Sequence, residues 1–251
     1  MDIKDYENKI INADCMDILK QLPDKSVDLV LTDPPYGTTA CQWDKIIPFS
    51  ELWKQIERIR KDDCAVVLFG QEPFSSYLRI SNISNYKYDW VWEKQKASNF
   101  MSMKKQPARY HELISVFYKH RYYPIMWETE KKDNRKTINN PKTNKECHLG
   151  NVVRIRNADT GMRYPKSIIK INKSINGNIH PTQKPVELLE YLLNTYSETN
   201  DVVLDFTSGS GSLAIACLRQ KRRFICIEKD KDYYEASVKR LEDAQKQLTL
   251  F

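Results

Sequence analysis

The sequence contains no apolar stretch that approaches the length of a membrane span, and its opening residues, MDIKDYENKI, hold no apolar signal-peptide core. We therefore expect a soluble, cytoplasmic protein. No internal repeat is visible, which argues against a repeat architecture. Hydrophobic residues make up 41% of the 251 residues and aromatic residues 11%, so the chain is not disordered overall and can bury one large core.

The cysteines form no CxxC pair and are scattered at positions 15, 41, 64, 147, 217 and 226. A disulfide framework is not expected in a chain of this size without secretory features. His148 follows Cys147 directly, but no second pair lies at zinc-finger spacing, so we expect no metal cofactor. This distribution is typical of buried structural thiols.

Positive charge is concentrated in one region of the chain. Residues 119–175 hold 14 Lys and Arg against 5 Asp and Glu, a net charge of +9, whereas the whole chain carries +7. The aromatic residues among these charges are Tyr122, Tyr123, Trp127 and Tyr164. This composition favours a surface that follows phosphates and stacks on bases, although an ordinary solvated face can also be basic.

The apolar pattern on either side of this region predicts alternating strands and helices. The expected strands are residues 9–12, 27–32, 65–69, 88–92, 113–118, 202–206 and 224–228. The expected helices are residues 16–22, 49–60, 213–220 and 233–248, with another that begins at Pro185. The strand, glycine turn, helix and strand near the end form a βαβ unit, so we predict an α/β fold with a doubly wound, mostly parallel sheet.

The pattern of alternating elements breaks down between residues 120 and 178. Residues 130–145 contain almost no apolar side chains and are predicted to form a loop. We therefore predict three parts: 1–118, a basic insertion at 119–178, and 179–251.

The first chemical motif is Asp205-Phe-Thr-Ser-Gly-Ser-Gly-Ser212, between a predicted strand and helix. Its two glycines allow a sharp turn and a close approach of ligand to backbone. Glu228, at the end of the next strand, is placed to bind a ribose diol. A dehydrogenase is one alternative, but the third glycine of GxGxxG is missing, as is a Walker lysine. A purely structural turn is another.

The second motif, Thr32-Asp-Pro-Pro-Tyr-Gly37, ends a buried strand, where open α/β sheets bind their ligands. A carboxylate beside a rigid Pro-Pro contributes little to stability, and a strand-ending turn is the less favoured interpretation. The Asp33 side chain and the Pro34 carbonyl can instead accept hydrogen bonds from an amino group, with Tyr36 as a stacking surface for a base.

Asp33-Pro-Pro-Tyr36 combined with the later DxxxGxG resembles the amino-methylating DNA methyltransferases. The catalytic motif precedes the cofactor loop, as in their permuted β class. Further similar segments are His180-Pro-Thr-Gln-Lys-Pro185, Asn12-Ala-Asp-Cys-Met-Asp17 and His111-Glu-Leu-Ile-Ser-Val-Phe117. One difference is that the family often has Pro-Phe after the aspartate of the glycine loop, where this chain has Phe206-Thr207.

The resemblance implies a Rossmann-like methyltransferase fold with a target-recognition insertion, and S-adenosyl-L-methionine as the cofactor. It assigns the catalytic motif to Asp33, Pro34, Pro35 and Tyr36. It assigns the cofactor contacts to Asp14, Cys15, Asp33, Thr182, Gln183, Lys184, Asp205, Phe206, Thr207, Ser208, Gly209, Gly211, Ser212 and Glu228. Asp14 and Cys15 would contact the adenine side of the cofactor and residues 182–184 its methionine end, although Lys184 could instead brace the loop. His180, His111 and Glu112 are expected to be structural or positional.

The implied reaction is methylation of N6 of a flipped-out adenine in double-stranded DNA. No Pro-Cys dipeptide occurs, which disfavours carbon-5 cytosine methylation because that reaction needs a cysteine nucleophile. The alternatives are N4-cytosine methylation, methylation of RNA or of a protein glutamine, and a non-catalytic DNA-binding subunit. A homodimer and a cognate restriction nuclease are further implied partners. The expected DNA contacts are Lys94, Lys96, Lys104, Lys105, Arg109, Arg154, Arg156, Arg163 and Lys166.

Overall fold

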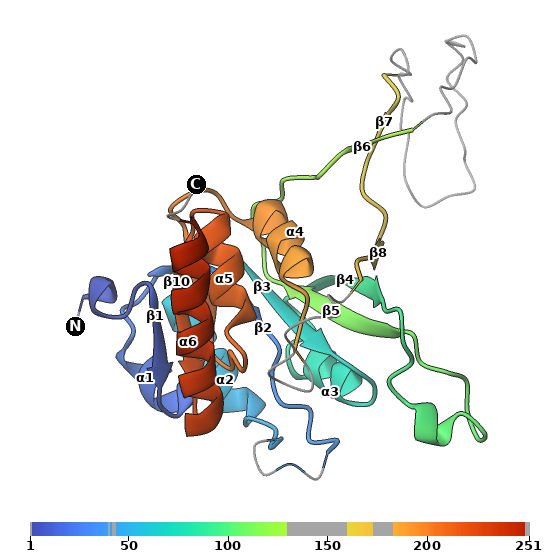
Figure 1. The fold of residues 1–251 in the computed structure, drawn as a ribbon, viewed down its shortest axis with the longest axis horizontal. Helices are drawn as coiled ribbons and strands as arrows, with labels where there is room; N and C mark the ends of the chain where they lie inside the picture. The colour runs from blue at the N-terminus through green and yellow to red at the C-terminus, as the bar shows by residue number, and fades with distance from the viewer. Residues whose placement is uncertain (1, 40, 42–43, 130–159, 173–182, 249–251) are drawn as a thin grey trace. The chain divides into compact units, whose positions relative to one another are not determined.

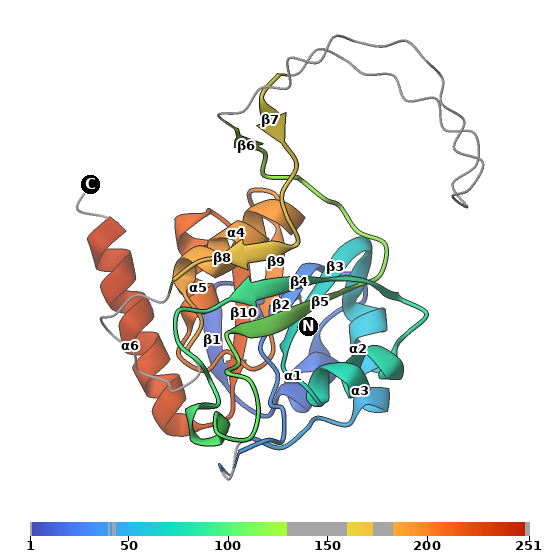
Figure 2. The same ribbon diagram turned by 90° about the vertical axis from the view of Figure 1, so that its right-hand side faces the viewer.

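Eight strands form one central sheet in the order β1, β10, β9, β2, β3, β5, β4, β8 (Figures 1 and 2). The computed structural model describes residues 2–39, 41, 44–129, 160–172 and 183–248. The strands are β1 (Lys9–Asn12), β2 (Val27–Thr32), β3 (Arg60–Gly70), β4 (Tyr86–Glu93), β5 (His111–Phe117), β8 (Ile168–Lys170), β9 (Val202–Asp205) and β10 (Arg223–Glu228). All neighbours pair in parallel except β5, which is antiparallel to both β3 and β4. The predicted mostly parallel sheet is confirmed.

Within the described residues, six α-helices cover the two faces of the sheet (Figure 2). They are α1 (Cys15–Gln21), α2 (Phe49–Ile59), α3 (Phe74–Ser81), α4 (Val186–Tyr196), α5 (Ser212–Arg219) and α6 (Lys231–Leu248). Helices α1, α2 and α3 pack on one face, and α4, α5 and α6 on the other. The short 3-10 helices are η1 (Ile3–Asp5) and η2 (Phe100–Ser102). Because helices cover both faces, the side chains of the central strands are buried on both sides of the sheet and must be mostly apolar.

Strand β3 shows how both faces are filled. Val67 and Phe69 belong to the core under α4, α5 and α6, whereas Val66 and Leu68 belong to the core under α1, α2 and α3. Successive side chains of a strand point to opposite faces, so a continuous apolar run is buried on both sides. Strand β2 also lies between two strands in the middle of the sheet, so all six of its residues are buried, the polar Asp28 and Thr32 included.

Between β2 and β9 the chain reverses the direction in which it adds strands to the sheet. From β2 it continues to β3 on one side, and from β9 to β10 on the other, through α2 and α5 respectively. Leu29 pairs with Val203 and Val30 with Leu204, so the two strands run side by side and end at the same edge. Such a switch point leaves a crevice at the carboxyl ends of the strands, where ligands bind in this class of fold.

Four features differ from the expectations. Helix α3 was not predicted, and β8 lies within the segment expected to be an insertion, where its residues pair with β4 from Val91 to Glu93. Strand β3 begins directly after α2, at Arg60, because the main chain turns to extended geometry there. Of the thiols, Cys41 is exposed, so the expectation of burial is wrong for that residue. Cys147 lies outside the described residues.

The chain divides by its contacts into two units, residues 1–123 with 167–251, and residues 124–166. In the smaller unit, β6 (Trp127–Glu128) pairs antiparallel with β7 (Met162–Arg163). Lys166 Nζ lies 5.1 Å from the centre of the Trp127 ring. The predicted division into residues 1–118, a basic insertion at 119–178, and 179–251 stays a prediction. None of the helices in the described part of the chain is long and apolar enough to cross a membrane.

Candidate active site

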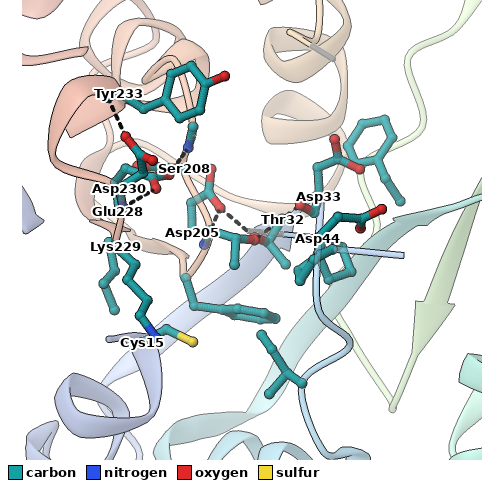
Figure 3. A pocket seen from close by; sticks show the side chains of 18 of the residues that line it. Cys15, Thr32, Asp33, Asp44, Asp205, Ser208, Glu228, Lys229, Asp230 and Tyr233 are labelled. Atoms are coloured by element: carbon teal, nitrogen blue, oxygen red, sulfur yellow. Dashed lines mark hydrogen bonds between the residues drawn. The ribbon is translucent and has the colours of Figure 1, made fainter. Parts of the chain in front are cut away.

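A cavity of about 1090 Å³ opens at the switch point, beyond the carboxyl ends of β2 and β9 (Figure 3). Its wall combines residues from the ends of β2, β9 and β10 with the start of α1 and the segment before α4. The predicted site residues that line it are Asp14, Cys15, Asp33, Pro34, Pro35, Tyr36, Gln183, Lys184, Asp205, Phe206, Thr207, Ser208, Gly209, Ser212 and Glu228. The fold thus brings together two motifs more than 170 residues apart.

Two predicted cofactor residues are not among those that line the cavity. Thr182 lies outside the described residues. Gly211 is in the left-handed region, with φ of 70°, and caps the start of α5. A Cβ atom at this position would lie 3.0 Å from Cβ of Ser237 and 3.3 Å from Cδ1 of Ile10. Glycine is therefore required at position 211 by backbone conformation and by the close approach of α6.

The ends of β2 and β9 are tied together by hydroxyl groups. The Thr32 hydroxyl donates to the Asp205 carboxylate (Figure 3) and lies 2.9 Å from Oγ1 of Thr207. Thr207 in turn donates to the main-chain carbonyl of Asp33, over 3.1 Å. The catalytic motif and the glycine loop are therefore held in register by direct contacts. Thr32 begins the predicted motif but was not predicted to be a site residue, because its partners come from the other end of the chain.

The structure shows where Phe206 and Thr207 lie, the two residues that stand where the family often has Pro-Phe. Phe206 is 1% exposed and belongs to the core under α1, α2 and α3. Thr207 is the residue whose side chain faces the Asp33 strand end. Both residues line the cavity.

Burial gives Asp205 an unusual protonation equilibrium. Loss of solvation raises the pKa of this carboxyl to about 7, despite hydrogen bonds from Thr32 and from the Thr207 amide that favour the charged form. Between the ordinary pKa of an aspartate and about pH 7, Asp205 is therefore mostly protonated in the folded state and mostly ionised in the unfolded chain.

The stability of the protein should consequently carry an Asp205 contribution that decreases with rising pH. Because the folded pKa is raised, this contribution is present at low pH and is lost as pH rises from about 4 towards 7, with a slope of at most about 1.4 kcal/mol per pH unit. Urea unfolding of the wild type and of Asp205→Asn, measured from pH 4.5 to 8, tests this. The difference between the two free energies of unfolding should change across the window; a constant difference would contradict the raised pKa.

Asp33 lies in a chain of alternating charges that reaches away from the cavity. Lys184 forms an ion pair with Asp33 and lies 3.2 Å from Oε2 of Glu112. Lys94 closes the chain, with its ammonium 2.8 Å from Oε1 of Glu112. Burial raises the pKa of Asp33, which Lys184 opposes, and the net direction is upward. Burial also acts on Glu112, but Lys184 and Lys94 outweigh it and lower the pKa of Glu112 to about 2.

Lys184 is thus a buried cation between two carboxylates. Desolvation disfavours its charged form, but Asp33 and Glu112 dominate, and the pKa of Lys184 is raised. Its side chain is 7% exposed, and its ammonium lies 5.0 Å from the centre of the Phe69 ring. In this structure Lys184 contacts the catalytic motif directly. Glu112, expected to be positional, forms an ion pair with Lys184 on the side away from the cavity.

The hydroxyl of Tyr36 donates to the other oxygen of the Asp33 carboxylate. The Tyr36 ring lines the cavity and packs against Phe74, with centroids 5.0 Å apart at an interplanar angle of 30°. Phe74 comes from α3, the helix that was not predicted. The aromatic ring is therefore held from one side by the core and presented to the cavity on the other.

Asp44 organises the loop that follows the catalytic motif. Its carboxylate accepts hydrogen bonds from the amides of Gly37, Thr38 and Thr39, at 2.8, 2.8 and 2.6 Å. Desolvation opposes these bonds, but they dominate, and the pKa of Asp44 is lowered. Three amides that converge on one carboxylate hold the turn beside Tyr36 in place. The sequence offered no signal for Asp44 beyond a lone acid in a polar stretch.

Two acids lie at the opposite end of the cavity. Glu228 accepts hydrogen bonds from the amides of Gly209 and Asp230, at 2.7 and 2.8 Å, so its carboxylate is fixed against the glycine loop. Asp14 caps α1 through the Met16 amide at 2.9 Å. Desolvation raises the pKa of Glu228. The position of the two acids beside the glycine turn is suited to hydroxyl donors of a ligand.

Ser208 gives the cavity an unfilled hydrogen-bonding position. Its hydroxyl is buried and has no hydrogen-bond partner among the described residues. A buried hydroxyl without a partner is costly, so such a group in a cavity indicates a polar ligand. Together with Glu228 and the positive-φ turn at Gly209, it fits a nucleoside-containing cofactor.

The residues expected to contact DNA fall into different surroundings. Lys96, Lys104 and Lys105 are exposed, and Arg109 is half-buried. Lys94 is 10% exposed and pairs with Glu112, so its place is in the charge chain of the site. Arg163 and Lys166 belong to the smaller unit. Arg154 and Arg156 lie outside the described residues.

The sheet order and the cavity at its switch point define the class of Rossmann-like methyltransferases. The chain belongs to the N6/N4 DNA methylase family, whose model, described as DNA methylase, matches residues 27–239. The predicted family and fold class are thereby confirmed, and the chain is an S-adenosylmethionine-dependent DNA amino-methyltransferase.

Several named relatives are similar to this chain in sequence, and solved structures share its fold. The chain is 29% identical to the Type II methyltransferase M.HinfI of Haemophilus influenzae, over 96% of this chain and 70% of that protein. It is 27% identical to M1.MboII of Moraxella bovis, over 90% and 93% of the two chains. The M1.HpyAVI–SAM complex shares its fold, with a TM-score of 0.60 and 23% identity over 93% and 98%. The cytosine-N4-specific PvuII DNA methyltransferase has a TM-score of 0.65 at 16% identity, over 95% and 91%.

Proposed function

We propose that the protein transfers a methyl group from S-adenosyl-L-methionine to N6 of an adenine that is flipped out of duplex DNA. The observation that carries this proposal is the position of Asp33. Asp33 lies at the switch point and lines the cavity, and its main-chain carbonyl accepts a hydrogen bond from Thr207 of the glycine loop that follows β9. An acceptor for an amino group and a nucleoside-binding turn are therefore within one cavity.

The proposed cofactor-binding residues surround the glycine-loop end of the cavity. Glu228 and the unpartnered Ser208 hydroxyl are suited to the nucleoside, and Asp14 and Cys15 line the wall next to them. When bound, S-adenosylmethionine supplies an electrophilic methyl group on its sulfonium. Gln183 and Lys184 line the cavity on the Asp33 side, so we assign the methionine end of the cofactor to that region.

The residues of the catalytic motif act on the amino nitrogen of the base. This nitrogen is a weak nucleophile because its lone pair is delocalised into the ring. The Asp33 carboxylate and the Pro34 carbonyl accept hydrogen bonds from its two N–H groups, which directs the lone pair away from the ring plane. Tyr36, held by Phe74, orients the Asp33 carboxylate through its hydroxyl and offers its ring to the base. Positioning and electrostatics then supply most of the acceleration.

Adenine is proposed because an aspartate opens the Asp-Pro-Pro-Tyr motif, which leans towards adenine in this family. The test is to incubate the protein with unmethylated duplex DNA and S-adenosylmethionine, digest the DNA, and identify the nucleosides by mass spectrometry. N6-methyladenine is the expected product. N4-methylcytosine would keep the mechanism and replace the base, because both bases present the same amino group. A cofactor-binding protein that modifies neither base would redirect the assignment to RNA or protein glutamine.

The proposed DNA contacts, considered separately in each of the two units, are basic residues outside the charge chain of the site. They are Lys96, Lys104, Lys105, Arg109, Arg163 and Lys166, with Arg154 and Arg156 proposed from sequence alone. Homodimerisation and a cognate restriction nuclease remain predictions.

Replacement of Lys104 and Lys105 by Gln should weaken DNA binding uniformly across sequences. Each lost phosphate contact should also make the plot of log affinity against log salt shallower by about 1. Fluorescence anisotropy between 50 and 300 mM salt measures both quantities. The matched control replaces Lys20 and Lys54, exposed on α1 and α2, and should leave the slope unchanged. An unaltered slope in the first variant would remove this loop from the DNA surface.

A further inference from the structure

The loop between β4 and β5 exposes apolar side chains in an entirely basic setting. Phe100 is 71% exposed, Met101 84% and Met103 44%. Residues 94–109 contain no Asp or Glu, and Lys104 and Lys105 follow the apolar group directly. Adjacent exposed apolar side chains of this size indicate a binding surface. The surrounding charge favours a polyanion as the partner.

Hydrogen bonds give the loop a defined shape. Lys94 donates its amide to the Tyr110 carbonyl at 2.7 Å, and Ser98 donates its amide to the Arg109 carbonyl at 3.0 Å. The Asn99 side chain accepts from the Arg109 amide at 2.7 Å and donates to the Pro107 carbonyl at 3.0 Å. Helix η2 then carries Phe100 and Met101 at the turn of the loop. The apolar side chains are therefore presented by a built hairpin.

The base of this hairpin is part of the active site. Its first residue, Lys94, pairs with Glu112, which holds Lys184 against Asp33. Gln71, after the end of β3, donates to the Ser98 hydroxyl at 3.0 Å and fixes the hairpin from a second side. Figures 1 and 2 show the loop, in green, extending beyond the strands that it joins. The apolar turn is thus connected, through the hairpin and these contacts, to the groups that act on the base.

We propose that this hairpin is a wedge that enters duplex DNA at the target base pair; the proposal rests on the function proposed above. Phe100 and Met101 occupy the space that the flipped base leaves in the stack, while Lys104 and Lys105 bind the flanking phosphates. Flipping costs unpairing and unstacking free energy, and an apolar side chain in the gap restores part of the lost stacking. The absence of acidic residues from the loop favours the phosphates of DNA over a protein as the partner.

The test compares a paired target with a target that is already unpaired. Once the methylated position is mapped with the wild type, two duplexes are made, one normal and one with an abasic site opposite the target base. The double variant Phe100→Ala/Met101→Ala should lose about 10- to 100-fold in kcat/KM on the normal duplex. On the abasic duplex it should stay within about threefold of the wild type, because that base flips at little cost. The rise in 2-aminopurine fluorescence at the target position should fall in parallel on the normal duplex.

A control variant, Tyr77→Ala/Ile80→Ala, removes side chains that are 61% and 71% exposed on α3, and should act like the wild type on both duplexes. Equal losses on the two duplexes, or no loss on the normal one, would overturn the wedge while leaving the methyltransferase assignment intact. A wild type that leaves no methylated base to map in duplex DNA would instead overturn the proposed function.

Discussion

Asp33→Ala is expected to reduce methylation of DNA by about 10³-fold or more while leaving S-adenosylmethionine binding within a few-fold of the wild type. The variant removes the acceptor that orients the amino group, an interaction needed at the reacting nitrogen. The glycine loop, Ser208 and Glu228 are untouched, so the nucleoside end of the cofactor site persists. Single-turnover methylation and titration calorimetry measure the two quantities.

The interpretation of Asp33→Ala depends on the neighbouring charges. Lys184 keeps Glu112 at 3.2 Å when Asp33 is removed, so the buried ammonium retains a partner and the fold should persist. Asp62→Ala, which removes a largely exposed carboxylate paired with Lys25, is the matched control and should leave both readouts unchanged. Loss of cofactor binding together with residual turnover would contradict the role assigned to Asp33.

Lys184→Met is expected to give the second large effect, and one that depends on pH. Burial already raises the pKa of Asp33, and Lys184 is the charge that opposes this rise. Without the ammonium, the pKa of Asp33 increases further and the ionised acceptor forms only at higher pH. The acidic limb of the kcat profile should therefore move upward by at least about one pH unit, with a loss of about 10- to 100-fold near pH 7 that lessens as pH rises.

The pH profile separates this positioning role from a merely structural one. Glu112 also raises the pKa of Asp33, so the double variant Lys184→Met/Glu112→Gln should bring the acidic limb back towards its original position. Lys170→Met, which removes an exposed lysine paired with Glu93, should leave the profile unchanged. A uniform loss of kcat at every pH in Lys184→Met, without rescue by the second substitution, would show that Lys184 only braces the loop.

The ion pairs of Glu112 and Lys184 should also make the stability of the fold depend on pH, at the acidic and the alkaline ends of the range. The pKa of Glu112 is lowered to about 2, so its ion pairs stabilise the fold above the ordinary glutamate pKa and this stabilisation is lost as pH falls towards 2. Lys184 has a raised pKa, so its contribution is present at neutral pH and is lost only in strong alkali. The ion pair between Glu112 and Lys184 is therefore present across the neutral range.

The two motifs could be placed from sequence because each depends on local geometry. Asp33 follows a buried strand and precedes two prolines that must end it, and the glycines after Asp205 must turn the chain into α5. Parallel strands that are neighbours end at one edge, so the two motifs had to meet if β2 and β9 were adjacent. That adjacency was only implied by the family resemblance until the sheet order showed it.

The sequence by itself determined the two motifs and most strands and helices, though not α3 or the place of β8 in the sheet, because periodicity, proline and glycine act over a few residues. Only the tertiary structure decided which side chains surround Asp33. Lys184 comes from 151 positions away, Glu112 reaches Lys184 from β5, and Asp44 closes the turn after the motif. Such contacts depend on how the elements pack, and no local pattern in the chain encodes them. For the same reason Lys94, indistinguishable by sequence from the other loop lysines, belongs to the active site, whereas Lys104 and Lys105 remain exposed.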